Sequence, residues 1–298
     1  MTEGDGVRAG VVIKASGGFY YVRSEAAVYA CVLRGRLRRQ GQQVLVGDEV
    51  EYTATGAQSG VIENVRPRRS RLVRPPVANV ERAVLVFAVQ DPHPNPLLID
   101  RLLIQAGAAG VTPVLCMNKA DLGAEKAAGL TSVYRPAGYA VLVTSAKTGA
   151  GLDALRKVLR TGVSVFAGPS GAGKSSLLNA LEPGLSLKTQ AVSAKIGRGR
   201  HTTRHVELLP LTGGGLVVDT PGFSSLALPL LECTELARFF PEFQAYLLDC
   251  RFTGCLHDQE PGCAVKQAVA AGKISRLRYE NYLKLLHEVI EQEKRKYD

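Results

Sequence analysis

A glycine-rich turn near the middle of the chain ends in a lysine and two serines, a combination suited to holding phosphate groups. The turn follows a short apolar run at 163–167 and precedes leucines at helical spacing, which predicts a strand, a loop and a helix. In the pattern G-x-x-x-x-G-K-[ST], backbone N–H groups and the helix N-terminus hold the phosphates. The lysine reaches the β- and γ-phosphates, and the first serine binds Mg²⁺. The predicted phosphate loop comprises Gly168, Pro169, Ser170, Gly171, Ala172, Gly173, Lys174, Ser175 and Ser176, with Lys174 also a candidate catalytic residue.

A four-residue motif after the apolar run 113–117 predicts which base is bound. Its last residue, Asp121, can accept hydrogen bonds from the N1–H and the exocyclic amine of guanine, whereas adenine would leave the carboxylate unpaired. An unpaired charge in such a site is costly, so we expect GTP to be preferred over ATP. Asn118 would brace the loop, and the stem of Lys119 would cover the base. The predicted base-binding residues are Asn118, Lys119, Ala120 and Asp121, with Ser145, Ala146 and Lys147 closing the pocket.

A D-x-x-G motif, Asp219 to Gly222, follows the strand-like run 216–218. In this position Asp219 reaches Mg²⁺ through a water molecule, and the backbone N–H of Gly222 contacts the γ-phosphate. Many GTPases carry a water-orienting glutamine directly after this motif, but this chain has Phe223. An apolar ring cannot polarise water, so we expect slow intrinsic hydrolysis that depends on outside help.

The segment 186–205 is polar and basic and shows no clean period, which is typical of a loop. Within it, His201 is the local candidate for a catalytic group, and a contact of His201 with RNA or solvent is an equal alternative. Thr202 or Thr203 would supply a hydroxyl to Mg²⁺, and the sequence does not choose between them. The predicted magnesium ligands are therefore Ser175, Thr202 or Thr203, and Asp219 through water.

Three cysteines and a histidine crowd into fourteen residues near the C-terminus. The spacing Cys-x₄-Cys-x-His-x₅-Cys is not the common finger spacing, but three thiolates and an imidazole match a closed tetrahedral zinc site. With all four positions filled by protein, we expect one structural Zn²⁺ rather than a catalytic one. The alternative is reduced cysteines around an ordinary histidine. The predicted zinc ligands are Cys250, Cys255, His257 and Cys263, whereas Cys31, Cys116 and Cys233 are scattered and expected to be small buried residues.

The composition is that of a globular protein attracted to polyanions. The 298 residues are 46% hydrophobic and carry a formal net charge of +10, which indicates contact with RNA or DNA. Two arginine-rich segments, 34–39 and 66–74, are punctuated by Gly or Pro, so we expect them on loops or strand ends that grip phosphates. Further basic surface is expected near the C-terminus from Lys266, Lys273, Arg276 and Arg278.

Membrane insertion is not expected. No apolar run approaches the roughly 18 to 20 residues that span a bilayer, and the first residues lack the basic and apolar parts of a signal peptide. A cytoplasmic location is the simplest expectation.

The elements around these motifs predict a multidomain chain. Residues 1–70 hold five short β-rich runs separated by turn signals, which favours an OB-type β-barrel, although a merely structural β-domain is an alternative. Residues 71–79 are expected to be a linker. Apolar strands alternating with helices over 80–228 predict a parallel sheet covered on both faces. Residues 229–298 are expected to form a mainly helical zinc-binding domain that ends in an amphipathic helix over 274–297, which contacts RNA or is simply solvated.

The order of the motifs is circularly permuted, because the base-binding loops precede the phosphate loop in the chain. Site geometry survives this change, since all these loops lie at the carboxyl edge of one sheet. The motif order, the segment 199–203 and the cysteine cluster resemble the RsgA/YjeQ family of circularly permuted, ribosome small-subunit-dependent GTPases. The resemblance covers essentially the whole chain.

The resemblance implies an N-terminal OB-type barrel, a central α/β P-loop GTPase core and a C-terminal zinc domain. It also implies GTP hydrolysis during late assembly of the 30S subunit, with ribosomal RNA as partner and His201 in catalysis. No self-association device is evident, so a monomer is expected. Two alternatives are a nucleic-acid-binding module with a slow nucleotide switch and an ATP-using P-loop enzyme, against which Asp121 argues. Because Asp219 precedes the zinc cluster by some thirty residues, we also expect γ-phosphate loss to act on that domain.

Overall fold

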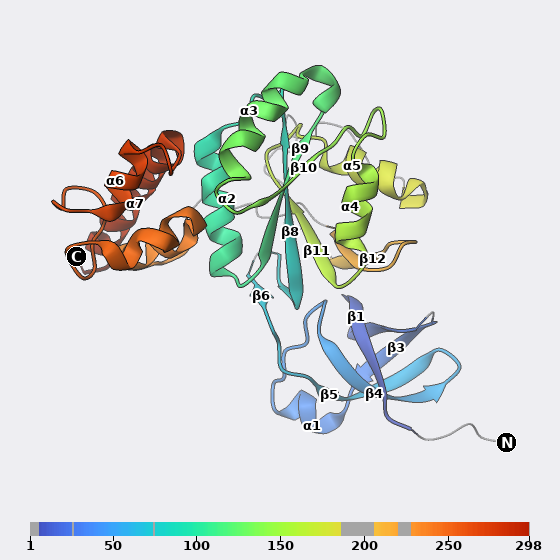
Figure 1. The fold of residues 1–298 in the computed structure, drawn as a ribbon. Helices are drawn as coiled ribbons and strands as arrows, with labels where there is room; N and C mark the ends of the chain where they lie inside the picture. Colours follow the sequence, from blue (N-terminus) through green and yellow to red (C-terminus); the bar gives the residue numbers. More distant parts are fainter. Residues whose placement is uncertain (1–5, 26, 74, 186–205, 220–227, 298) are drawn as a thin grey trace, which may run out of the picture.

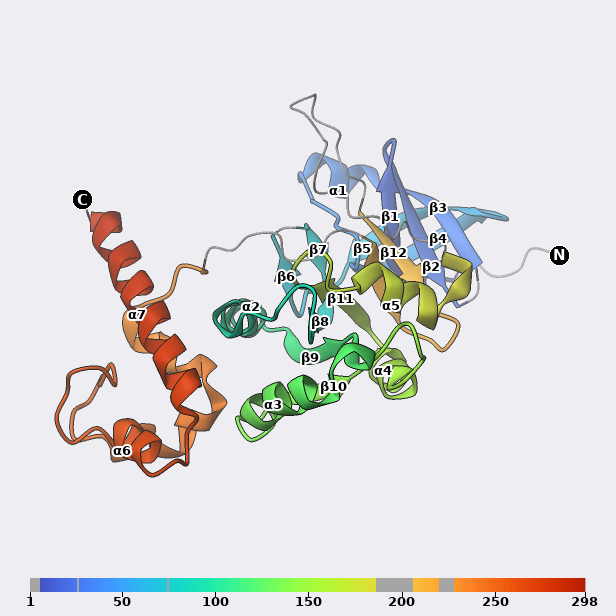
Figure 2. The ribbon, with the colours of Figure 1, turned by 90° about the horizontal axis from the view of Figure 1, so that it is seen from above.

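The computed structural model describes residues 6–25, 27–73, 75–185, 206–219 and 228–297, which form three domains (Figure 1). An N-terminal β-barrel and a C-terminal helical domain lie on different sides of a central α/β core (Figures 1 and 2). The predicted fold class is confirmed. Within the described ranges, no helix has both the length and the apolar character needed to cross a bilayer.

The N-terminal barrel has five strands in the order β1-β2-β3-β5-β4, closed by pairing of β4 with β1. Alternate residues point inward, so that Val12, Val22, Tyr52 and Ile62 form a core with no exposed surface. The strands are β1 (Arg8–Ser16), β2 (Phe19–Ser24), β3 (Ala27–Leu33), β4 (Glu49–Gly56) and β5 (Ser59–Val65). All five predicted β-rich runs are therefore strands.

The first arginine-rich segment is a short helix, not the loop that its composition suggested. Helix α1 (Gly35–Arg39) buries Leu37 against the barrel core and leaves its arginines exposed. The apolar residue in the middle of the cluster therefore anchors it to the barrel.

The segment after the barrel is packed between the barrel and the core. It contains two short antiparallel strands, β6 (Arg71–Leu72) and β7 (Val77–Ala78), and both residues of β7 are fully buried. The Asn79 side chain follows, donating from Nδ2 to the Gly47 carbonyl at 2.9 Å and accepting at Oδ1 from the Arg69 N–H at 2.9 Å. These contacts bring the barrel close to the core.

The core is a sheet covered by helices on both faces. On β8, Leu85 and Phe87 point to the face covered by α2 and α3, and Val84 and Val86 point to the face covered by α4 and α5. Strand β12 is antiparallel to β13 and the other pairings are parallel, in the order β10-β9-β8-β11-β13-β12. The elements are β8 (Val80–Ala88), α2 (Pro96–Ala108), β9 (Thr112–Asn118), η1 (Ala120–Leu122), α3 (Ala124–Tyr134), β10 (Ala140–Val143), α4 (Leu152–Leu159), β11 (Val163–Ala167), α5 (Lys174–Leu181), η2 (Pro183–Leu185), β12 (Glu207–Pro210) and β13 (Leu216–Asp219).

The barrel and the core share one continuous sheet. Strand β12 at the edge of the core pairs antiparallel with β1 of the barrel, with Lys14 opposite Glu207. The result is an eleven-stranded sheet that runs from β10 into the closed barrel. Pairing at Glu207 covers one end of the β12 edge, where unpaired backbone groups would otherwise be open to another strand.

The C-terminal domain packs its own apolar core against α2. The ring centres of Phe240, Phe243 and Tyr282 lie 5.0 to 5.1 Å apart in tilted and edge-to-face arrangements, and Ile104 of α2 joins the same cluster. The predicted amphipathic helix is present, but Arg278 at its start is 1% exposed and is not basic surface, because two carboxylates bind it. The elements are η3 (Cys233–Phe239), η4 (Pro241–Asp249), α6 (Ala264–Ala270) and α7 (Arg276–Tyr297).

Candidate nucleotide site and metal centre

The phosphate loop lies between β11 and α5, and two of its glycines cannot be replaced without a clash. Gly168 has a φ of 131°, and a Cβ there would lie 2.0 Å from the Val86 carbonyl oxygen. Gly173 has a φ of 91°, and a Cβ there would lie 2.3 Å from Asn118 Nδ2. Both residues therefore need glycine for conformation and for space.

Lys174 begins α5 and folds back over the phosphate loop. Its Nζ donates to the carbonyl oxygens of Gly168 and Pro169, both at 2.8 Å. Burial lowers the pKa of Lys174 from its usual value. An arriving phosphate would offer this ammonium a charged acceptor, which forms a stronger hydrogen bond than a neutral carbonyl.

Asn118 joins three of the predicted segments. It is 1% exposed, and its Nδ2 donates to the Ala172 carbonyl of the phosphate loop at 2.9 Å. Its Oδ1 accepts from Thr144 Oγ1 and from the Ala146 N–H, both at 3.3 Å. One buried side chain thus links the base-binding motif, the closing segment after β10 and the phosphate loop at the same edge of the sheet.

Asp121 lies on η1 with its carboxylate exposed beside the closing segment. Ser145 Oγ donates to Asp121 Oδ1 at 2.5 Å, and this hydrogen bond lowers the pKa of Asp121 below its usual value. The side chain is therefore ionised at neutral pH and acts only as an acceptor. The N–H of Ala120 donates to the Thr144 carbonyl at 3.1 Å, which holds the two segments together.

The segment 90–95 borders the site and was not among the predicted site residues. Lys119, which has a φ of 60°, donates from Nζ to the carbonyl oxygen of Asp91. The ring of Pro92 lies beside Gly171, since a Cβ at that glycine would be 3.4 Å from Pro92 Cδ. The sequence did offer a signal for this segment, because it follows the buried strand β8. Loops that follow parallel strands lie together at the carboxyl edge of the sheet, where the nucleotide site is expected.

The remaining nucleotide-site predictions lie largely outside the described residues. Ser175 is placed, half-buried in the first turn of α5. Asp219 ends β13, but its side chain is not described. The other predicted residues, His201, Thr202, Thr203 and Gly222, together with Phe223, fall outside the described ranges.

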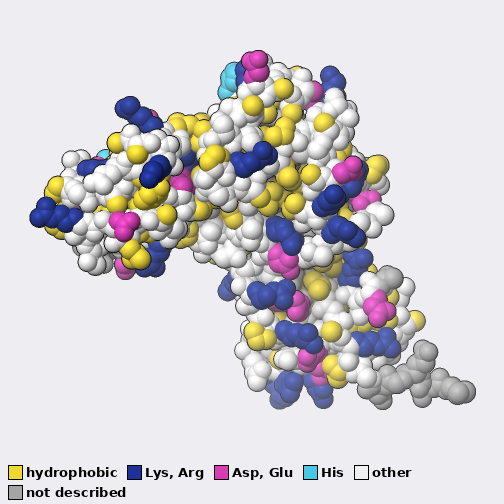
Figure 3. Space-filling view, in the orientation of Figure 1, with side chains coloured by type: hydrophobic (Ala, Val, Ile, Leu, Met, Phe, Trp, Pro, Cys, Tyr) yellow, Lys and Arg dark blue, Asp and Glu magenta, His cyan; other side chains and the backbone are white. Residues whose placement is uncertain are grey.

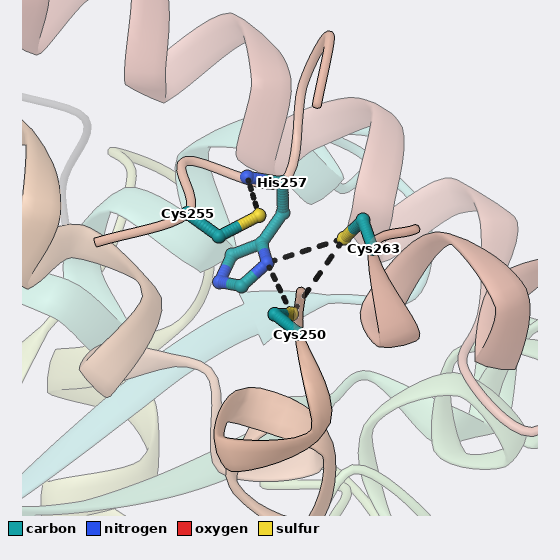
Figure 4. Close-up of side chains that lie close together, drawn as sticks. All are labelled: Cys250, Cys255, His257 and Cys263. Carbon is teal, nitrogen blue, oxygen red and sulfur yellow. Dashed lines mark hydrogen bonds between the residues drawn. The ribbon is translucent and has the colours of Figure 1, made fainter. Parts of the chain in front are cut away.

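The four predicted metal ligands converge on one point of the C-terminal domain (Figure 4). His257 Nδ1 lies 3.3 Å from Cys263 Sγ and 3.6 Å from Cys250 Sγ, and these two sulfurs are 3.9 Å apart. All four ligand atoms, including Cys255 Sγ, lie within 4.8 Å of one another. A tetrahedral zinc ion with Zn–S bonds of about 2.3 Å has ligand–ligand edges of about 3.5 to 3.8 Å, close to these spacings.

Hydrogen bonds hold the metal-binding loop in shape. His257 has a φ of 58° and is 2% exposed, and its carbonyl accepts from Tyr279 Oη of α7 at 2.7 Å. The Glu260 carboxylate accepts from the N–H groups of Leu256 at 2.7 Å and Asp258 at 3.0 Å. The loop is therefore fixed from its own backbone and from the long helix behind it.

The pKa shifts of the cluster fit a site that binds a cation. Burial lowers the pKa of His257, which keeps the imidazole in the neutral form that binds metals. Burial also raises the pKa of Cys255 to about 12, so this thiol needs a nearby positive charge to ionise. Among the scattered cysteines, Cys31 and Cys116 are buried as predicted, and Cys233 is only half-buried.

The two arginine-rich segments differ in their contacts. In the second segment, Arg68 donates to buried Asp48 at 2.7 Å, while Arg69 and Arg66 pair with Glu49 and Glu51 on β4. This segment therefore has a structural role that the sequence did not reveal. On α1, the side chains of Arg38 and Arg39 are exposed and make no hydrogen bond or ion pair within the described ranges.

Comparisons with known sequences identify two matching family models. The model of the RsgA GTPase family matches residues 65–229, and that of the RsgA N-terminal domain matches residues 9–62. Among curated relatives, the small ribosomal subunit biogenesis GTPase RsgA of Moorella thermoacetica is 52% identical, over 96% of this chain and 98% of that relative. The protein of the same name from Shouchella clausii is 47% identical, over 96% of this chain and 99% of that relative.

Two solved structures have the same fold along nearly the whole chain. YjeQ from Thermotoga maritima superposes with a TM-score of 0.84 and is 39% identical, covering 95% of this chain and 99% of YjeQ. YloQ, described as a circularly permuted GTPase, has a TM-score of 0.85 and 38% identity, with 98% of each chain covered.

Proposed function

The chain belongs to the RsgA GTPase family, and from this premise we propose that it binds the small (30S) ribosomal subunit and hydrolyses GTP to GDP and phosphate during late subunit assembly. The observation that carries the proposal is the Asn118 junction, which unites the base-binding and phosphate-binding segments at one edge of the sheet. The names of the curated relatives supply the small subunit as the partner.

The chain's residues would bind GTP from both ends. Ionised Asp121 would accept from the N1–H and amine of guanine, with Lys119 over the base and Ser145, Ala146 and Lys147 closing the pocket. Residues 168–176 would surround the phosphates, and Lys174 would move from the loop carbonyls to the β- and γ-oxygens. When bound, Mg²⁺ would neutralise developing phosphate charge, and it would be held by Ser175, by Thr202 or Thr203 and, through water, by Asp219. The backbone N–H of Gly222 would contact the γ-phosphate.

Hydrolysis would be slow on the free protein and faster on the subunit. Phe223 occupies the place where other GTPases orient water with glutamine, so a water-positioning group must come from elsewhere. We assign His201 as the candidate within this chain, brought into place by contact with the subunit.

The cysteine cluster would hold one structural Zn²⁺. The closed set of Cys250, Cys255, His257 and Cys263 leaves no open coordination position for a reacting water. Its contribution is therefore to the shape of the C-terminal domain.

Ribosomal RNA would contact exposed cations on the barrel. Lys and Arg side chains gather over the barrel among fewer acidic ones on the face seen in Figure 3. Arg38 and Arg39 of α1 are the best-placed contacts, because they are exposed and no described carboxylate pairs with them, unlike Arg68 and Arg69.

The proposal is tested by measuring GTP and ATP turnover with and without 30S subunits. We expect the 30S subunits to stimulate the turnover of GTP but not that of ATP. In Asp121→Asn, an amide donor replaces a carboxylate acceptor, so GTP should be used poorly and xanthosine triphosphate, which has a carbonyl at position 2, should be used instead. Asp153→Asn, which changes an exposed side chain of α4, is the matched control. Equal use of ATP would refute the guanine assignment, and GTP binding with flat turnover on subunits would favour the nucleic-acid-binding module with a slow switch.

A further inference from the structure

A buried arginine holds the metal-binding domain to the core. Arg278 of α7 is 1% exposed, and its Nη1 donates to Asp100 of α2. Its Nε and Nη2 donate to Glu242 of η4 at 2.7 and 3.1 Å, and Nη2 also lies 3.3 Å from Tyr139 Oη. The second oxygen of Asp100 accepts from Asn281 Nδ2 at 2.7 Å. Each guanidinium nitrogen and both oxygens of each carboxylate are therefore hydrogen-bonded.

Aromatic rings surround the guanidinium. The ring centres of Phe240, Tyr139 and Tyr134 lie 4.4, 5.2 and 5.4 Å from its central carbon. Burial by itself would lower the pKa of Arg278, but Asp100 and Glu242 together outweigh it and raise this pKa above its usual value, so the guanidinium stays charged. A buried ion pair of this kind contributes little net stability over an apolar contact of the same shape, but its geometry fixes one arrangement of the elements that meet there.

Those elements lead directly to the base-binding edge of the nucleotide site. Helix α2, which carries Asp100, begins just after the segment 90–95 that contacts Lys119 and Gly171. Tyr139 lies directly before β10, the strand that runs into the closing segment 145–147. The network therefore connects α7 to the supports of the guanine end of the site, on one side of the sheet (Figure 2).

We propose that Arg278 is a positioning residue for the subunit-stimulated reaction. It holds the metal-binding domain in one orientation on α2 and on the α3–β10 connection, so that contact of this domain with the small subunit acts on the nucleotide site. This inference rests on the proposed function. The route differs from the one suggested by chain order, because it passes through α2 and not along the segment after Asp219.

The test separates binding of the subunit from turnover on it. Arg278→Met retains length but loses every polar contact, Arg278→Lys retains the charge, and Arg276→Ala removes an exposed pair with Glu280 on the same helix as a control. We expect Arg278→Met to change basal kcat/KM for GTP by less than about twofold. At saturating subunit, its stimulated kcat should fall about tenfold, with Arg278→Lys intermediate and Arg276→Ala unchanged.

A purely stabilising role would give a different result. Loss of folded domain would raise the subunit concentration needed for half-maximal stimulation, while kcat at saturation would recover. Such recovery in both Arg278 variants overturns the proposal. Metal content and hydrogen exchange of α7 establish that each variant is folded. If Arg278→Met loses its metal, the stimulated kcat of Arg278→Lys alone decides between a positioning role and a stabilising one. Absence of stimulation in the unmodified protein would instead refute the proposed function.

Discussion

The core is joined to its two outer domains by different chemistry. Strand β12 joins the barrel by backbone pairing with β1, and the one ion pair on this ladder, Lys14 to Glu207 at 3.0 Å, leaves both side chains 37% exposed. The C-terminal domain is joined through Arg278, Asp100 and Glu242, whose side chains are 1%, 0% and 6% exposed. The β12–β1 pairing of the first joint uses groups that every residue has, with Asn79 adding side-chain hydrogen bonds to Gly47 and Arg69. The second joint uses buried ionised side chains.

This difference predicts which joint a single substitution can break. Backbone hydrogen bonds survive most side-chain changes, so the barrel joint should be tolerant. A buried charge left without its partner is costly, so the other joint should be sensitive. The cluster of Cys250, Cys255, His257 and Cys263, which we propose to hold zinc, adds a second dependence on particular residues at the same end of the molecule.

Removal of the metal should have the largest effect, and only at the C-terminal end. Folding and metal binding are coupled in small zinc sites, with apparent binding free energies of about 10 to 16 kcal/mol. We therefore expect chelation, or Cys263→Ala, to remove the hydrogen-exchange protection of α6 and the start of α7. The pairing of β12 with β1 should stay protected. Cys31→Ala, a buried cysteine outside the cluster, is the control. Full protection of α6 in metal-free protein would contradict a structural metal.

Substitution of Asp100 should have the next largest effect. Asp100→Ala leaves Arg278 buried with Glu242 alone, which should lower the free energy of unfolding of the C-terminal domain by about 3 to 5 kcal/mol. Urea denaturation followed by circular dichroism measures the change. Asp153→Ala, whose partner is the exposed Arg156, should cost less than about 1 kcal/mol. Equal effects of the two substitutions would mean that the buried Arg278 network is no more costly to break than an exposed ion pair.

The sequence predicted well where the signal is local. The barrel strands were recognisable because each is a short apolar run bounded by turn residues. The cysteine–histidine cluster was recognisable because its members, from Cys250 to Cys263, lie close in the chain. The base-binding and phosphate-binding motifs could be assigned to one edge because parallel strands end there. Spacing and chain direction were sufficient for these features.

The sequence predicted poorly where a residue depends on a distant partner. Arg278 was grouped with Arg276 as basic surface, but Asp100 lies 178 residues away in the chain, and no spacing reveals that they meet. In the same way, Arg68 was expected to grip phosphate, and it binds Asp48, which is fully buried on the barrel. Composition gives the number of positively charged side chains, but it does not reveal which of them are paired with carboxylates in the folded protein.

Substitution of Lys14 should have the smallest effect. Lys14→Met keeps the apolar stem and the β1 backbone but removes the ion pair with Glu207 across the joint. Since exposed pairs contribute about 0.2 to 1 kcal/mol and weaken with salt, the loss in free energy of unfolding should stay below about 1 kcal/mol and vanish at high salt. Urea denaturation at two salt concentrations measures both effects. A loss of unfolding free energy as large as that of Asp100→Ala would mean that the barrel is also held by one side-chain contact. The backbone pairing of β12 with β1 is the same in Lys14→Met and in the unmodified protein, so it could not account for such a loss.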